Sequence, residues 1–212
     1  MKKLIAVAVM FCSMFCALNL PVFGETTSRG AAYTAKEIEL RTAMKKLLSQ
    51  CLNRQRVLTG VVIYGPGSPE KPLAQLAETS DSIGKIFEAY YGPQNGAQLA
   101  GLFKQYIMLT SDYIDAAKSK GDTAAVTGRI NGKADQIAAL VNSGNRIRKN
   151  ARLAGILKRY AASVSAEIDL QGSGQRTPDS AKYGQSFRLS AELADALATR
   201  IVRQFPEHFP KQ

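Results

Sequence analysis

The stretch Leu99-Ala-Gly-Leu-Phe-Lys-Gln-Tyr106 occurs a second time, 54 residues later, as Leu153-Ala-Gly-Ile-Leu-Lys-Arg-Tyr160. An alignment of residues 80–116 with residues 134–170 needs no gap and gives 11 identities in 37 positions. A match at a fixed offset that preserves helical spacing indicates a duplicated supersecondary unit. The sequence therefore predicts two tandem helical hairpins.

Helical spacing also extends outward from the two copies. Apolar residues recur three and four apart in every segment, and none shows the sustained period-two alternation of a strand. Thr34-Ala-Lys-Glu37 has the pattern of a capping box, which predicts a helix start. Turn-forming residues predict breaks at 65–69, 92–93, 121–122, 142–145 and 171–176. We therefore expect an all-α, antiparallel up-down bundle, with the two hairpins flanked by a first and a last helix.

The N-terminus has the pattern of a secretory signal peptide. Lys2 and Lys3 precede an apolar run from Leu4 to Leu20, and Pro21-Val-Phe-Gly24 follows. We expect residues 1–24 to be removed, leaving no membrane span and a periplasmic or extracellular protein; a retained membrane anchor is the alternative. The remaining chain is then divided into a flexible segment (25–33), one helical domain (34–206) and a C-terminal tail (207–212).

Charge and cysteine content limit the kinds of partner and of covalent link. The formal charge is +11, or +9 once Lys2 and Lys3 are lost with the signal segment. This excess favours contact with an anionic polymer or envelope surface. Cys12 and Cys16 lie in the signal segment, so Cys51 remains alone and an intramolecular disulfide is impossible.

Signatures of catalysis are missing from the sequence. It contains no phosphate loop, no nucleophile elbow, no two-histidine zinc helix and no paired cysteine motif. The single histidine, His208, is expected in the solvated tail. We assign no catalytic residue, cofactor or metal ligand. Asp81 and Asp135 are expected to be structural partners of Arg56, Arg200 or helix-start amides; the alternative is a general acid and base pair, which would make the protein an enzyme.

Three polar residues on apolar helix faces form the first candidate site. Cys51, Tyr106 and Tyr160 each lie near the middle of a long predicted helix. Three helices that point them inward together would create a polar interior able to hold a small ligand or a metal ion. The alternative is an ordinary core, in which the tyrosine hydroxyls bond to neighbours and Cys51 packs as a small apolar residue.

A run of cations forms the second candidate site. Arg146, Arg148, Lys149 and Arg152 occur without an acidic residue around the start of the fifth predicted helix, where the helix dipole disfavours cations. A site for a phosphate or a polyanion is one interpretation, and a solvated charged face is the other. Aromatic residues do not alternate with these charges, so the sequence contains no specific nucleic-acid motif.

Several short motifs resemble those of an uncharacterised family of bacterial helical-bundle proteins. They are Ile83-Gly-x5-Tyr90-Tyr91-Gly92, the two Leu-Ala-Gly stretches, Lys133-Ala-Asp135-x-Ile137-Ala138 and Arg203-Gln-Phe-Pro206. The likeness spans about residues 40–209. Histidines are common in that family at the positions of Cys51, Tyr106 and Tyr160, so the resemblance implies a polar or metal-binding interior in the relatives.

Together these patterns predict an exported binding or interaction module without catalytic activity, with an anionic partner. The alternative function is a protein that binds a small ligand or a metal in its core through Cys51, Tyr106 and Tyr160. The sequence names neither the ligand nor the oligomeric state.

Overall fold

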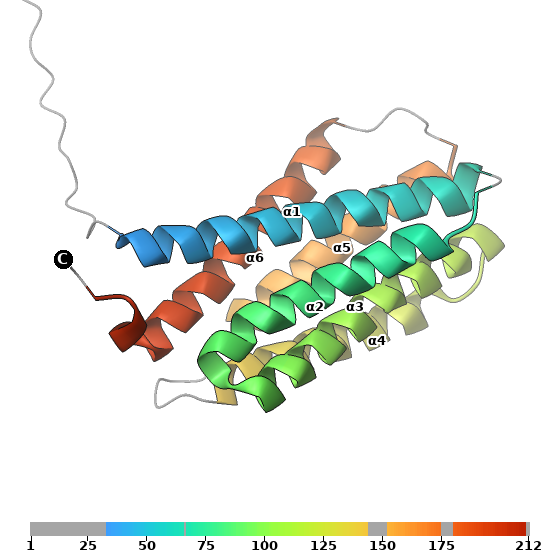
Figure 1. Ribbon diagram of the computed structural model, residues 1–212. Helices are drawn as coiled ribbons and strands as arrows, with labels where there is room; N and C mark the ends of the chain where they lie inside the picture. The colour runs from blue at the N-terminus through green and yellow to red at the C-terminus, as the bar shows by residue number, and fades with distance from the viewer. Residues whose placement is uncertain (1–32, 66, 144–151, 175–179, 211–212) are drawn as a thin grey trace, which may run out of the picture. The chain divides into compact units, whose positions relative to one another are not determined.

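Six helices make up nearly all of the structure, a computed structural model that describes residues 33–65, 67–143, 152–174 and 180–210 (Figure 1). They are α1 (Ala35–Tyr64), α2 (Glu70–Tyr91), α3 (Pro93–Ser119), α4 (Thr123–Ser143), α5 (Arg152–Gly172) and α6 (Ser180–Gln204), followed by the short 3-10 helix η1 (Pro206–His208). No strand occurs within these residues. The all-α prediction is therefore confirmed.

The helix ends follow the local signals of the sequence. At the start of α1 the Thr34 hydroxyl accepts from the Glu37 amide, and the Glu37 carboxylate accepts from the Thr34 amide at 2.8 Å. This reciprocal pair is the predicted capping box. Between α2 and α3 the backbone of Gly92 has a φ of 84°, a conformation that glycine adopts without a steric penalty.

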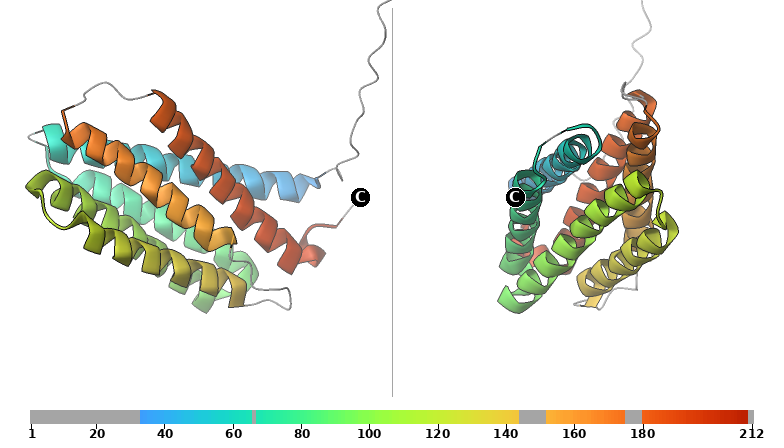
Figure 2. Two further views of the ribbon diagram at one scale, coloured as in Figure 1. Left: turned by 180° about the vertical axis from the view of Figure 1, so that it is seen from behind. Right: turned by 90° about the vertical axis from the view of Figure 1, so that its right-hand side faces the viewer.

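The six helices close into a ring in which each packs against its neighbours in the chain and α6 returns to α1 (Figures 1 and 2). Helices α1, α3 and α5 also contact one another across the inside of this ring. The two copies of the repeated stretch lie on α3 and α5. Buried apolar side chains from all six helices fill the core, among them Met44, Leu76, Ile107, Ile137, Leu157 and Leu197.

Close contact between α2 and α3 depends on small residues. A Cβ atom built on Gly84 would lie 2.5 Å from the Cβ of Ala100, which belongs to the first Leu-Ala-Gly stretch. A Cβ atom on Gly101 or on Gly155 would meet nothing within 4 Å. The close approach therefore requires the glycine at position 84, and in the first copy of the repeat it is Ala100, not Gly101, that faces it.

The C-terminal segment differs from the solvated tail that we expected from residue 207. Phe209 is buried and its ring stacks on Tyr90 with centroids 5.7 Å apart. The ring of His208, half exposed, meets Tyr90 edge-on at 5.5 Å. Burial of these aromatic faces against α2 offsets the cost of ordering the chain end.

Some predictions fall outside the described residues. These are the signal segment 1–24, residues 25–32, and Cys12 and Cys16. The described residues belong to one compact unit, Tyr33–Gln212. A search of the described helices for a membrane span finds none that has both the length and the apolar character to cross a bilayer.

Candidate functional site

The three predicted interior residues come together in the bundle. Cys51 on α1, Tyr106 on α3 and Tyr160 on α5 are each no more than 4 % exposed. Their helices are the three that meet inside the ring, and the electrostatic interactions of Cys51 reach both tyrosines. The sequence spacing therefore predicted their convergence correctly.

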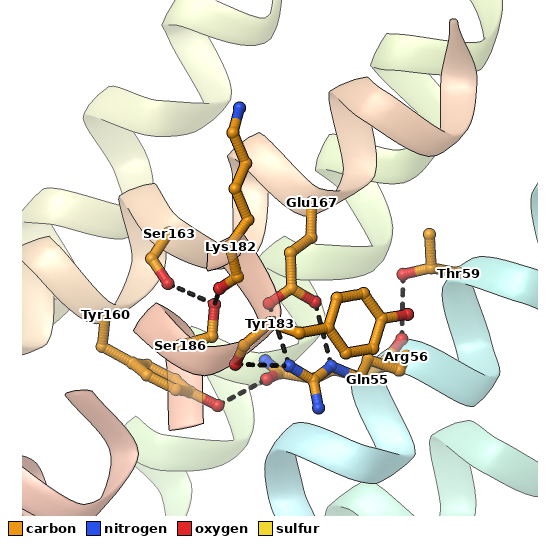
Figure 3. Close-up of polar contacts among 9 residues, drawn as sticks. All are labelled: Gln55, Arg56, Thr59, Tyr160, Ser163, Glu167, Lys182, Tyr183 and Ser186. Atoms are coloured by element: carbon orange, nitrogen blue, oxygen red, sulfur yellow. Dashed lines mark hydrogen bonds and ion pairs between the residues drawn. The ribbon is translucent and has the colours of Figure 1, made fainter. Parts of the chain in front are cut away.

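Each tyrosine hydroxyl in this interior has a protein partner. Tyr160 donates to Gln55 Oε1 at 2.7 Å (Figure 3). Gln55 Nε2 in turn donates to Thr110 Oγ1 at 3.2 Å. Tyr106 donates to the backbone carbonyl of Leu157 at 3.0 Å. We call Cys51, Gln55, Tyr106, Thr110 and Tyr160 the interior cluster. The hydroxyl hydrogens of its two tyrosines are used within the protein, as in an ordinary core.

Burial also keeps the interior cluster uncharged at neutral pH. Desolvation raises the pKa of Cys51 from 9.0 to about 12, against the smaller opposing effects of a hydrogen bond to Tyr160 and the charge of Arg54. Desolvation, followed by the proximity of Cys51, raises the pKa of both Tyr106 and Tyr160. The thiol and both phenols are therefore protonated at neutral pH. Among the described residues, no group of three His, Cys, Asp or Glu side chains is arranged to hold a metal ion.

An ion pair that the sequence did not reveal lies beside this cluster. Arg56 binds both carboxylate oxygens of Glu167 at 2.9 and 3.0 Å (Figure 3). The guanidinium also lies 3.8 Å above the ring of Tyr183 and donates to that residue's carbonyl. Glu167 is 4 % exposed, so the charge of Arg56 compensates a buried carboxylate.

The two matched aspartates do not pair with either of the two arginines that we expected. Asp135 pairs with Lys158 at 2.8 Å, and Asp81 is exposed. Arg56 binds Glu167 instead, and Arg200 binds Asn142. The two aspartates match at the 54-residue offset of the repeat. This match does not indicate which distant cation each of them faces.

A second site lies where α6 passes the C-terminal end of α4 and the N-terminal end of α5. Its cations are Arg152, Arg200 and Arg203, and we call it the anion pocket. The residues that line it are Asn142, Arg152, Leu153, Glu192, Asp195, Ala196, Thr199, Arg200 and Arg203. Of the four cations predicted as an anion site, Arg152 lies in this pocket, whereas Arg146, Arg148 and Lys149 lie outside the described residues.

Arg200 is the unusual member of the anion pocket. It is 7 % exposed, yet its Nε has no hydrogen-bond partner. Its Nη2 donates to the neutral side-chain oxygen of Asn142, and no carboxylate pairs with it among the described residues. A buried, uncompensated charge costs free energy. The pocket therefore contains a cation whose hydrogen-bonding capacity is incompletely used.

The two acidic residues of the anion pocket are each paired with at least one cation from outside the pocket. Glu192 binds Arg159 at 2.9 Å and also lies 3.8 Å from Arg152. Asp195 binds Arg41 at 3.0 Å and lies 3.7 Å from Lys45. Arg203 is exposed and has no ion-pair partner in the part of the chain that the structure describes. The pocket is consequently cationic despite its two carboxylates.

Sequence reasoning missed Arg200 and Arg203 because they are spaced along an amphipathic helix like ordinary surface charges. The one signal available was the position of Arg200, three residues after Leu197 on a helix whose apolar face includes Ile201.

Comparisons with models of protein families, with curated proteins and with solved structures find no match for this chain.

Proposed function

We propose that this protein is an exported, non-catalytic binding module and that the anion pocket binds a phosphate-bearing ligand. One observation carries the proposal: Arg200 is buried in the pocket with an unpartnered Nε and without a compensating carboxylate in the described structure. A bound anion would supply both the missing acceptor and the missing charge. Without an anion, no carboxylate in the described structure offsets the free-energy cost of burying this arginine.

The chemistry of the pocket favours phosphate over a simple halide or a single carboxylate. Guanidinium groups present a planar fork of donors that matches two phosphate oxygens. Arg152, Arg200 and Arg203 line the same pocket from two helices, so a ligand with several oxygens can contact more than one of them. The N-terminal end of α5, where Arg152 and Leu153 lie, adds the favourable end of a helix dipole.

The interior cluster supports a ligand site less well. The hydroxyls of Tyr106 and Tyr160 already donate to protein oxygens, and the amide of Gln55 joins two of the polar side chains. A ligand there would have to replace these bonds before it gained any of its own. We therefore assign the binding role to the anion pocket.

The test is titration calorimetry of the purified protein with tripolyphosphate. We expect saturable binding that weakens about tenfold or more in Arg200→Met, the change expected for loss of one or two charge-assisted hydrogen bonds. Arg203→Gln should weaken binding less, because its side chain is exposed. Lys104→Gln removes the same charge from α3, outside the pocket, and should leave the affinity unchanged. Equal losses in Arg200→Met and Lys104→Gln would overturn the assignment of the pocket.

Export is a separate part of the proposal with its own test. N-terminal sequencing of protein recovered from outside the cytoplasm should find a chain that begins after residue 24. Recovery of the protein only in the cytoplasm, with Met1 retained, would contradict it. The charge left after cleavage, +9, is consistent with a partner in an anionic envelope.

A further inference from the structure

A groove continues from the anion pocket along the line where α5 and α6 pack antiparallel. We call it the α5–α6 groove. Its polar lining residues are Arg159, Ser163, Lys182, Gln185, Arg188 and Glu192. Glu192 lines both the groove and the anion pocket, so the two hollows adjoin. At the base of the groove the hydroxyls of Ser163 and Ser186 hydrogen-bond to each other and join the two helices (Figure 3).

The groove has the same charge as the pocket. Arg159, Lys182 and Arg188 contribute three cations, and Glu192 is its single acidic lining residue. Glu192 is paired with Arg159, whereas Lys182 and Arg188 have no ion-pair partner among the residues that the structure describes. Figure 3 shows the side chain of Lys182 extended away from the Arg56–Glu167 pair. Two cations of the groove are thus available to a ligand.

The cations of the α5–α6 groove and of the anion pocket form an elongated row rather than a single compact site. We call this row the track. Lys182 and Arg203 mark its ends on α6 and are 21 residues apart. At 1.5 Å per residue the track is about 30 Å long. A single phosphate or tripolyphosphate reaches one end of it at most. A flexible chain of regularly spaced anions can contact cations along its whole length.

The residues along this track favour a polymer that is recognised through its backbone. None of the side chains that line the groove or the pocket is aromatic, so there is no platform on which nucleobases could stack. Arginines, a lysine and amide side chains are suited to phosphate oxygens. We propose that the anion pocket and the α5–α6 groove together bind one linear phosphate polymer, with Arg200 holding one segment and Lys182 and Arg188 holding another. This proposal rests on the proposed function of the anion pocket.

The test compares polyphosphate chains longer than about 30 Å with tripolyphosphate in the double variant Lys182→Gln/Arg188→Gln. We expect the variant to lose about tenfold or more in affinity for the long chain and to keep wild-type affinity for tripolyphosphate. The salt dependence should weaken too, because two fewer counterions are displaced: the slope of log K against log salt should fall by roughly two. The matched control, Lys85→Gln/Lys104→Gln, removes two exposed charges from α2 and α3 and should change neither the salt slope nor the affinity for the long chain.

The outcomes separate the two proposals. Wild-type affinity of Lys182→Gln/Arg188→Gln for the long chain would overturn the track, while tripolyphosphate binding that depends on Arg200 would still support the pocket. Failure of wild-type protein to bind either probe would overturn both proposals. A glycerol-phosphate polymer in place of polyphosphate distinguishes an envelope source from an inorganic one, since both share the phosphate backbone. Tighter binding of oligothymidylate or of anionic lipid vesicles than of polyphosphate would contradict recognition of a base-free phosphate chain.

Discussion

The interior cluster and the anion pocket both contain buried polar side chains, but they satisfy them differently. In the interior, Tyr160, Gln55 and Thr110 form a chain of hydrogen bonds, and desolvation keeps the thiol and the phenols neutral. In the pocket, the charged Arg200 is buried with its Nε unpartnered. A satisfied polar core stabilises one packing arrangement, whereas an unsatisfied cation creates a binding preference. Substitutions in the interior cluster and in the anion pocket should therefore differ in their effect on stability.

The largest effect on stability is expected beside the interior cluster, at Glu167. Glu167→Ala leaves Arg56 without its carboxylate, and removal of one partner from a buried ion pair costs about 3 kcal/mol. Urea unfolding followed by circular dichroism measures this loss. A double-mutant cycle with Arg56→Ala should give a coupling of more than about 1 kcal/mol. If the losses of the two single variants simply add in the double variant, the two side chains are not coupled, and the pair is not part of the hydrogen-bonded core.

A smaller loss, about 1–2 kcal/mol, is expected for Tyr160→Phe because the buried side-chain oxygen of Gln55 loses its donor. Tyr106→Phe is the matched control. The acceptor of Tyr106 is the carbonyl of Leu157, which lies within α5 and still receives its helical N–H. Unfolding measurements should therefore rank Tyr160→Phe as the more damaging change. The reverse order would contradict our view of Gln55 as the centre of the network.

The pH dependence of stability offers a third way to examine the interior. The pKa of Cys51 is higher in the folded protein, about 12, than its ordinary value of 9.0, so folding favours the protonated thiol. This contribution is complete below pH 9 and is lost as the pH rises toward 12. The buried tyrosines act in the same direction, from pH 10 upward. The free energy of unfolding should fall above pH 9, with a shallower slope in Cys51→Ala; a flat profile to pH 11 would be inconsistent with a sealed interior.

The smallest change in stability is expected in the anion pocket. Arg200→Met removes a desolvated charge and one hydrogen bond to Asn142, and these opposing effects should keep the free energy of unfolding within about 1 kcal/mol of wild type. The measurement is urea unfolding without added anion. A loss of about 3 kcal/mol would show that Arg200 acts like Arg56, as a structural cation, and the distinction between the two regions would disappear.

Local patterns in the sequence predicted the helices and three of the five residues of the interior cluster. The capping box at Thr34 and the turn at Gly92 require only neighbouring residues, and a three-to-four spacing identifies the side of each helix that faces the core. For this reason Cys51, Tyr106 and Tyr160 were placed together correctly. Duplication of the hairpin stays a prediction, although both copies of the stretch lie on helices that reach the centre.

Partners that are distant in the chain were beyond the reach of these patterns. Arg56 and Glu167 are 111 residues apart, and which charged residues meet depends on how the helices are rotated in the bundle. The same holds for the anion pocket, which forms only when α6 passes the ends of α4 and α5. Phe209 was assigned to a tail because no periodicity continues past Pro206, yet its ring packs on Tyr90.

The central claim is that the Nε of Arg200 receives its missing partner from an anionic ligand. Nitrogen-15 NMR of arginine Nε–H groups tests it directly, with the resonance of Arg200 assigned by its loss in Arg200→Met. We predict that this resonance shifts and saturates with tripolyphosphate at the same concentration as binding measured by calorimetry. An Arg200 resonance that stays in place while the ligand binds would contradict the claim and move the site away from the anion pocket.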